Sequence, residues 1–166
     1  MSDLKIRPIE KGDDPEIGIL VRKVLLEFGV PKVGTAYADK SLDAMFDHYQ
    51  KPRSAYFILS ENNQIIGGGG IAPLDNYEGN VCELQKMYFL PEARGRGMGT
   101  KMIDICLQKA AELNYDACYL ETMSYMKAAT HLYQRYGFDT LKGPMGDTGH
   151  HACGVHMIKT LSHEIE

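Results

Sequence analysis

The stretch Leu90–Thr100, LPEARGRGMGT, constrains the fold of this chain more than any other. It places three glycines and two arginines between an apolar run at 81–90 and a helical pattern at 99–113. A strand that ends in a glycine-rich turn and opens a helix gathers unpaired N–H groups at one point, where the helix dipole adds about half a positive charge. Because glycine also lets the backbone approach a ligand closely, the turn predicts a phosphate site.

Two common phosphate motifs do not fit this turn. A P-loop needs Lys and then Ser or Thr after its last glycine, whereas Thr100 and Lys101 follow Gly99 in the opposite order. A dinucleotide fingerprint, G-x-G-x-x-G, would need glycine at position 100 and a place near the first strand. The remaining pattern is Arg94-x-x-Gly97-x-Gly99, in which the arginines are expected to add charge-assisted contacts.

Strand and helix patterns are mixed along the chain. Alternation and apolar runs predict strands at 4–10, 54–60, 64–74, 81–90, 116–122, 138–141 and 154–161. Helical spacing predicts helices at 13–30, 41–50, 99–113 and 126–138. The β–α–β–α order of the second half indicates one α/β sheet with helices on both faces.

Capping and turn residues mark the ends of several elements. Asp14 is expected to cap the first helix, with Pro15 at its first helical position, and Ser41 to cap the second. Gly137 is expected to end the last helix. The segment 61–63, Glu-Asn-Asn, predicts the turn of a hairpin between the second and third strands.

Composition fits a single domain spanning residues 1–166, with 44% hydrophobic and 24% charged residues. The net charge of -4 disfavours a nucleic-acid partner, and no apolar run approaches the ~20 residues of a membrane span. The segment 1–14 lacks the apolar core of a signal peptide, and the cysteines form no CxxC pair. We therefore expect a reduced, cytoplasmic protein with neither nucleic-acid nor membrane partners; a homodimer stays open.

A second motif lies in the last predicted helix, where residues 128–138 read AATHLYQRYGF. Together with the glycine turn, this segment resembles the signature of the GNAT superfamily of acyl-CoA-dependent N-acetyltransferases. The two motifs cover residues 82–138, and for the first eighty residues only the order of elements fits. The resemblance implies acetyl transfer from acetyl-CoA to a primary amine of a small molecule or a peptide. A non-catalytic acyl-CoA-binding or sensor module of the same fold is the alternative.

The resemblance also implies a mixed, mostly antiparallel twisted sheet that splays at the fourth strand, with acetyl-CoA in the gap. The pyrophosphate would lie on the backbone of the glycine turn and the pantetheine along the edge of the fourth strand. The cofactor-binding residues would then be Met87, Tyr88, Phe89, Arg94, Gly95, Arg96, Gly97, Met98, Gly99 and Thr100. The chain departs from the family pattern at Met126, where the family often has a cofactor-binding Asn.

Three side chains are candidates for the chemistry. An alkyl ammonium has a pKa near ~10.4 and must lose its proton before it can attack a thioester. Tyr133 matches the family residue that protonates the leaving thiolate, although a core tyrosine with a satisfied hydroxyl fits the helix equally well. Glu83 and Glu121 match positions of catalytic carboxylates that work through a water. The sequence leaves open which of them is the base, with Glu83 favoured, or whether a water chain replaces both.

Strand geometry bears on the same site. A backbone N–H near Met87 or Tyr88 would stabilise the oxyanion that forms on the thioester carbonyl. A regular strand alternates its side chains between two faces. The side chains expected on one face are those of Glu83, Gln85, Met87 and Phe89, with Leu84 and Tyr88 on the other.

Other reactive or flexible residues favour structural explanations. Cys82 would permit an acetyl-cysteine route, but a buried strand cysteine is the more frequent case. Gly67–Gly70 lies in a strand with no helix after it, which favours close packing or a bulge over phosphate binding. The segment 146–156 gathers His150, His151, Cys153 and His156, with His150 and His151 on opposite sides if the segment is a strand. Their spacing fits no standard zinc site, so we expect no metal. We expect a loop followed by a strand, lying beside the acceptor pocket.

Overall fold

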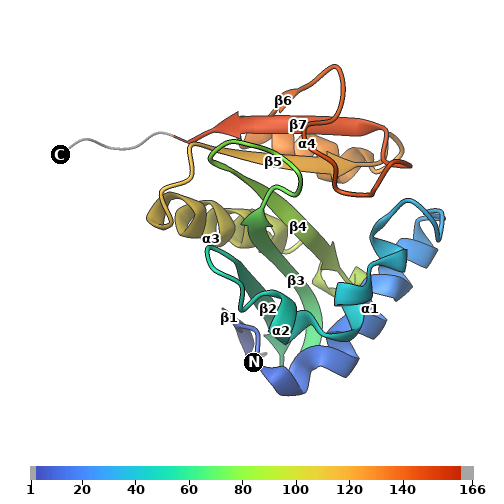
Figure 1. The fold of residues 1–166 in the computed structure, drawn as a ribbon. Coiled ribbons are helices and arrows are strands. Elements are labelled where there is room, and N and C mark those ends of the chain that lie inside the picture. The colour runs from blue at the N-terminus through green and yellow to red at the C-terminus, as the bar shows by residue number, and fades with distance from the viewer. Residues whose placement is uncertain (1–2, 162–166) are drawn as a thin grey trace.

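The computed structural model of the protein describes residues 3–161, so the ends of the expected domain 1–166 lie outside the described residues. Within them, seven strands form one sheet in the order β1-β2-β3-β4-β5-β7-β6 (Figure 1). The strands are β1 Leu4–Pro8, β2 Ala55–Glu61, β3 Gln64–Pro73, β4 Val81–Phe89, β5 Ala117–Thr122, β6 Asp139–Thr140 and β7 Val155–Thr160. All neighbours are antiparallel except β4 and β5, which are parallel.

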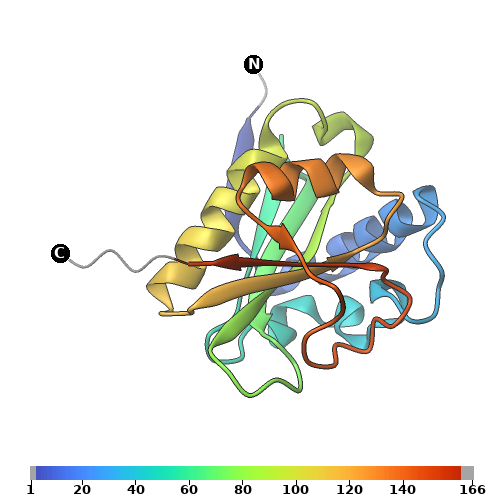
Figure 2. The ribbon, with the colours of Figure 1, turned by 90° about the horizontal axis from the view of Figure 1, so that it is seen from above.

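Helices cover both faces of the sheet, which confirms the predicted fold class (Figures 1 and 2). The α-helices are α1 Asp14–Glu27, α2 Met45–His48, α3 Met98–Glu112 and α4 Lys127–Arg135. Short 3-10 helices lie at Lys11–Asp13, Ala36–Ala38, Lys40–Asp43 and Pro91–Ala93. One apolar cluster packs α1 and α2 on the sheet, and a second packs α3 and α4 on the opposite face. None of the helices among residues 3–161 is long and apolar enough to cross a bilayer.

The predicted hairpin between β2 and β3 is present, and its turn has the chemistry that the sequence indicates. Asn62 and Asn63 both adopt left-handed backbone conformations, with φ of 51° and 65°. Asparagine tolerates this region, and two such residues form the tight turn that matches the twist of paired strands. The next residue pair, Glu61 with Gln64, closes the hairpin.

A β-bulge interrupts the pairing of β3 with β4. Gly68 pairs with Tyr88 and Gly70 with Gln85, so Gly69 faces two residues, Lys86 and Met87. Lys86 takes a left-handed conformation with φ of 49°, which is strained for a residue with a long side chain. The extra residue changes which face the following side chains occupy.

The expected alternation along β4 is therefore wrong beyond Gln85. Met87 packs in the cluster under α3, close to where a side chain at Gly69 would point, whereas Tyr88 packs in the cluster under α1. Glu83 and Tyr88 lie on one face, and Met87 lies on the other. The bulge is the physical reason, since one additional residue reverses the alternation that a regular strand would keep.

Glycines make this bulge possible, which confirms the expectation of close packing at Gly67–Gly70. A Cβ at Gly68 would lie 2.6 Å from the Tyr56 hydroxyl oxygen, and one at Gly70 would collide with the Ala55 carbonyl. The Tyr56 hydroxyl donates to the carbonyl of Lys86 at 2.7 Å. A buried carbonyl displaced from the strand ladder thus keeps a hydrogen-bond partner.

The gap expected at the fourth strand begins after three residue pairs. Val81, Cys82 and Glu83 of β4 pair with Ala117, Cys118 and Tyr119 of β5, and the two strands then separate. The remaining half of β5 pairs only with β7, where Glu121 lies opposite His156. Figure 1 shows β4 and β5 diverging toward the side on which α1 lies.

The expected helix caps are confirmed at one end and wrong at two others. Gly137 has φ of 88° and follows α4, while the amide of Phe138 donates back to the Tyr133 carbonyl at 3.1 Å. Asp14 is the first residue of α1 instead of its cap, and its carboxylate accepts from the amide of Phe46 at 2.8 Å. Ser41 lies inside a 3-10 helix, because Ala44, with φ of -145° and ψ of 54°, separates that helix from α2.

Candidate active site

The glycine turn forms the start of α3 as predicted. Gly97 precedes the helix with φ of 75°, and Gly95 has φ of 72°. A Cβ at either position would meet no atom within 4 Å, so the turn faces open space. Left-handed backbone strains any residue with a Cβ, which explains glycine at both positions. The first amides of a long helix are presented at this opening.

A groove runs from this turn along the edge of β4 toward α4. Its walls are the turn, the last three residues of β4, and the face of α4 that carries Ala129, Leu132 and Tyr133. Of the residues predicted to bind a cofactor, those that line the groove are Met87, Tyr88, Phe89, Arg94, Gly95, Gly97, Met98, Gly99 and Thr100. Arg96 does not line it, and Met126, at the family's asparagine position, does.

The two arginines of the turn are paired with acidic side chains of the protein. Arg94 contacts both carboxylate oxygens of Glu27, at 2.6 and 3.0 Å, and donates to the Phe89 carbonyl. Arg96 contacts Glu61 at 2.7 and 3.1 Å. The positive potential that the groove offers an anion in this arrangement therefore comes chiefly from the amides at the start of α3, not from the guanidinium groups.

Tyr133 lies where the groove meets a deeper cleft and lines both. Its ring is 8% exposed and packs edge-on against Phe138, with ring centroids 5.9 Å apart. Its hydroxyl makes no hydrogen bond with any of residues 3–161, and it is not among the buried polar atoms that lack a partner. Burial raises the pKa of the phenol, which keeps it protonated at neutral pH.

Glu83 projects from β4 into the deeper cleft and is 4% exposed. One of its oxygens accepts from the Gln85 amide at 2.6 Å, and Gln85 in turn accepts from the Tyr49 hydroxyl at 2.7 Å. Burial raises the pKa of Glu83 to about 7; the Gln85 hydrogen bond opposes this and the charge of Glu121 adds to it. A carboxyl with this pKa exchanges its proton near neutral pH.

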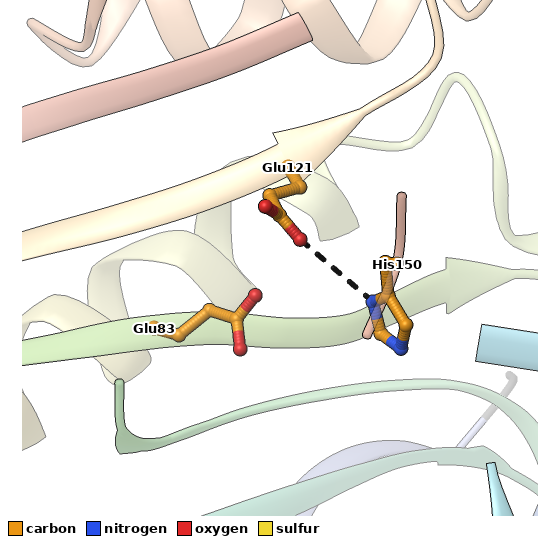
Figure 3. Close-up of side chains that lie close together, drawn as sticks. All are labelled: Glu83, Glu121 and His150. Atoms are coloured by element: carbon orange, nitrogen blue, oxygen red, sulfur yellow. Dashed lines mark ion pairs between the residues drawn. The ribbon is translucent and has the colours of Figure 1, made fainter. Parts of the chain in front are cut away.

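Glu121 projects from the separated half of β5 toward Glu83 (Figure 3). It accepts from the Tyr119 hydroxyl at 2.7 Å and from the Thr148 hydroxyl. Its side chain is 4% exposed. The divergence of β4 and β5 thus brings the two predicted carboxylates to opposite walls of one cleft.

His150 is the third group at this cleft, and its place was not predicted. Its Nδ1 lies 3.9 Å from a Glu121 oxygen, and its Nε2 lies 2.9 Å from both oxygens of Asp39 (Figure 3). Burial lowers the pKa of His150, but the hydrogen bond to Asp39 and the charges of Asp39 and Glu83 outweigh it, so the net direction is upward. The Lys86 ammonium lies 3.4 Å from Asp39 and completes this network.

The histidine-rich segment is a loop that leads into β7, which confirms the expected order of loop and strand, and strand alternation does not apply to its first residues. His151 is exposed and lies near Gly34, while His156, on β7, has its Nε2 3.9 Å from Glu121. Cys153 lines the cleft, and burial raises the pKa of its thiol to about 12. In the sequence, the clustered histidines were the signal that pointed to this cleft. No sequence pattern pointed to Asp39.

Cys82 faces away from the cleft, although it is adjacent to Glu83. It is fully buried under α3 in the same cluster as Cys106 and Cys118. This placement fits the reading of a small core residue and offers no path to a thioester in the groove.

A further hollow opens beyond the cleft and shares Glu83, Gln85, Lys86 and His150 with it. Its outer wall comes from the segment around α2 and from the loop after β3, which contribute Asp39, Lys40, Ser41, Ala44, Asp47, His48 and Asp75. The groove and the cleft likewise share Tyr133, so the groove, the cleft and the hollow adjoin one another in this order.

A turn of amides before α3, a splayed parallel strand pair and a groove along β4 define an acetyltransferase of the GNAT family, to which the chain belongs: the model of the acetyltransferase (GNAT) family matches residues 23–138. The uncharacterized N-acetyltransferase YjgM of Escherichia coli K12 is 39% identical over 157 residues, which cover 94% of both chains.

Solved structures show the same fold. A GNAT-family acetyltransferase from Staphylococcus aureus Mu50 has a TM-score of 0.81 at 21% identity, covering 96% of this chain and 100% of its own. The yncA protein of Salmonella typhimurium, solved with its cofactor acetyl-CoA, has a TM-score of 0.77 at 17% identity, covering 99% and 97%.

The burial of Glu83 predicts a pH-dependent stability difference. Its pKa of about 7 in the folded protein exceeds the ordinary 4.5, so the folded state binds the proton more tightly and loses stability as pH rises between these values. Glu83→Gln removes this titration. We expect its free energy of unfolding, relative to wild type, to increase by about 2 kcal/mol from pH 5 to pH 8 in urea denaturation.

The exposed Glu78→Gln is the control for exchanging a carboxylate for an amide. Parallel pH curves for wild type and Glu83→Gln would show that Glu83 titrates alike in the folded and unfolded chain.

Proposed function

We propose that the protein transfers an acetyl group directly from acetyl-CoA to a primary amine of a small molecule or a peptide. The observation that carries this proposal is the row of adjoining hollows from the glycine turn past Glu83. It offers one opening suited to a pyrophosphate and another suited to an amine, with acid and base candidates between them.

The groove residues would bind acetyl-CoA along its length. The amides from Arg94 to Thr100 would hold the pyrophosphate at the start of α3, and the edge of β4 from Met87 to Phe89 would pair with the pantetheine. The yncA structure, which contains acetyl-CoA in the same fold, supports this placement. The thioester would then reach the bulge of β4, beside Tyr133.

The chemistry divides among three groups. Glu83, with a pKa of about 7, would accept the amine proton through a water, and Glu121 would form the opposite wall. A strand amide near Met87 or Tyr88 would stabilise the oxyanion. Tyr133, kept protonated by burial, would donate its proton to the leaving thiolate.

Thiol release from acetyl-CoA, measured over a panel of primary amines, tests the proposal. Amine-dependent release with a matching N-acetyl product supports it. Acetyl-CoA binding without release for any amine would favour a non-catalytic acyl-CoA-binding or sensor module.

Gly97→Val is expected to weaken acetyl-CoA binding at least tenfold, measured by calorimetry. Its side chain would fill the open space over the turn and strain a backbone with φ of 75°. Gly149→Val is the matched control, because Gly149 has φ of 79°, also faces open space, and lies outside the groove. Equal affinities for wild type and Gly97→Val would remove the pyrophosphate assignment.

Tyr133→Phe should lower turnover by roughly 10²–10³ with little change in acetyl-CoA affinity, because it removes only the proton donor. Tyr115→Phe is the control, since that buried hydroxyl donates to the Arg53 carbonyl and does not line the cleft or the groove. If Tyr133→Phe stays within threefold of wild type, another group protonates the thiolate.

Glu83→Gln is expected to lose more activity than Glu121→Gln. In wild type, kcat/KM should fall as pH drops below about 7, because protonated Glu83 cannot accept a proton; the variant should lack this limb. The loss should shrink at pH 9, where more of the amine is already neutral. Wild-type pH profiles for both variants would favour a water chain as the base.

A further inference from the structure

Three hydrogen-bond acceptors converge in the cleft from three parts of the chain. One oxygen of Glu83, one of Glu121 and one ring nitrogen of His150 lie within 4.8 Å of one another (Figure 3). They come from β4, β5 and the loop before β7. The second oxygen of Glu83, a side chain that is 4% exposed, receives no hydrogen bond from residues 3–161. This group of side chains can therefore accept hydrogen bonds from a ligand.

The tautomer of His150 follows from its partner. Asp39 offers only acceptor oxygens, so the Nε2 atom that contacts both of them must carry the proton. In the neutral imidazole, Nδ1 then carries the lone pair, and this atom faces Glu121. Asp39 therefore acts through His150, because it determines which ring nitrogen is free to accept a hydrogen bond.

We propose that Glu83, Glu121 and Nδ1 of His150 form a binding site, called the cradle here, for an unhindered primary ammonium. Each of the three groups accepts one of its three N–H donors. The ammonium is the protonated form of the amine that is to be acetylated. This inference rests on the proposed acetyl transfer to an amine. It names His150 as a specificity-determining residue and Asp39 as the residue that positions it.

The spacing of the three acceptors is wide enough for an ammonium. Charged N–H···O bonds of about 2.8 Å, directed at tetrahedral angles, place acceptors about 4.6 Å apart. A zinc ion with ligands at about 2.1 Å would draw them to about 3.4 Å. The 3.9 Å between Nδ1 of His150 and the nearest oxygen of Glu121 lies between these two values, and all three acceptor atoms lie within 4.8 Å of one another.

Protonation of His150 opposes ammonium binding, because it converts Nδ1 into a donor. The ammonium and the proton therefore compete for this site. The groups that surround the imidazole are Asp39 beside the 3-10 helices, Glu83 and Lys86 on β4, Glu121 on β5, His156 on β7 and Cys153 in its own loop. The kinetic test is run at pH 8.5 to favour the neutral imidazole.

His150→Gln and His150→Asn separate the two nitrogens. Glutamine can place its amide nitrogen near Nε2 and keep the contact with Asp39, but it lacks the Nδ1 acceptor. Asparagine can place an oxygen near Nδ1. We expect His150→Gln to raise the KM of the best primary amine about tenfold and to leave the KM of acetyl-CoA unchanged, with His150→Asn nearer to wild type.

The N-methyl derivative of the same amine supplies the internal comparison, since it has only two N–H donors and should respond less than threefold to His150→Gln. His151→Gln, in the same loop but exposed, is the control variant. Equal effects on both amines, an effect on the KM of acetyl-CoA, or no advantage of asparagine over glutamine would overturn the cradle.

A binding test separates this inference from the proposed function. In protein labelled with ¹⁵N-histidine, n-butylammonium should shift the Nδ1 resonance of His150, assigned by its loss in His150→Gln, while butyltrimethylammonium, which has no N–H, should not. If n-butylammonium shifts this resonance but no amine is acetylated, the cradle is supported and the transferase proposal is refuted. A proton on Nδ1 of the neutral imidazole, or equal shifts with both ions, overturns the cradle.

Discussion

The hydrogen bond from the Tyr56 hydroxyl to the Lys86 carbonyl holds the bulge on which the site geometry depends. A carbonyl pushed out of the strand ladder and buried without a partner would be costly, and Tyr56 provides that partner. Gly68 supplies the room that the tyrosine ring requires. Because of the bulge, β4 places Met87 on the α3 side of the sheet, opposite Glu83.

The cleft concentrates charge in a place that water hardly reaches, and neighbouring donors offset part of the cost. Glu121 has two hydroxyl donors, from Tyr119 and Thr148, whereas Glu83 has one amide donor from Gln85. The less compensated carboxyl is the one whose pKa burial raises toward neutrality. Two carboxylates of the same chemical type thereby become suited to different tasks.

Local patterns were enough to predict the element order, the hairpin and the glycine turn before α3, because apolar periodicity, paired asparagines and clustered glycines each act over a few residues. The run Gly67–Gly70 indicated close packing or a bulge, but the reversed alternation of β4 could not be foreseen, since it depends on how Lys86 registers against Gly69 across the sheet. Nor could the contact of His150 with Asp39, which joins residues 111 positions apart. Asp39 lies between two short 3-10 helices, where no periodic pattern marks it. Side chains set by long-range pairing are the part of the site that a single sequence conceals.

The adjoining hollows have two mouths, the groove at the start of α3 and the hollow beyond His150, and the cleft lined by Glu83 and Tyr133 lies between them. On the proposed function, donor and acceptor would approach from opposite ends, so neither would have to leave before the other could bind. Cys82 points away from both mouths, and no covalent relay is needed to hold the acetyl group between visits. Such a layout belongs to enzymes that gather both substrates in one ternary complex, and it lets spent coenzyme depart without crossing the path of the acetylated product.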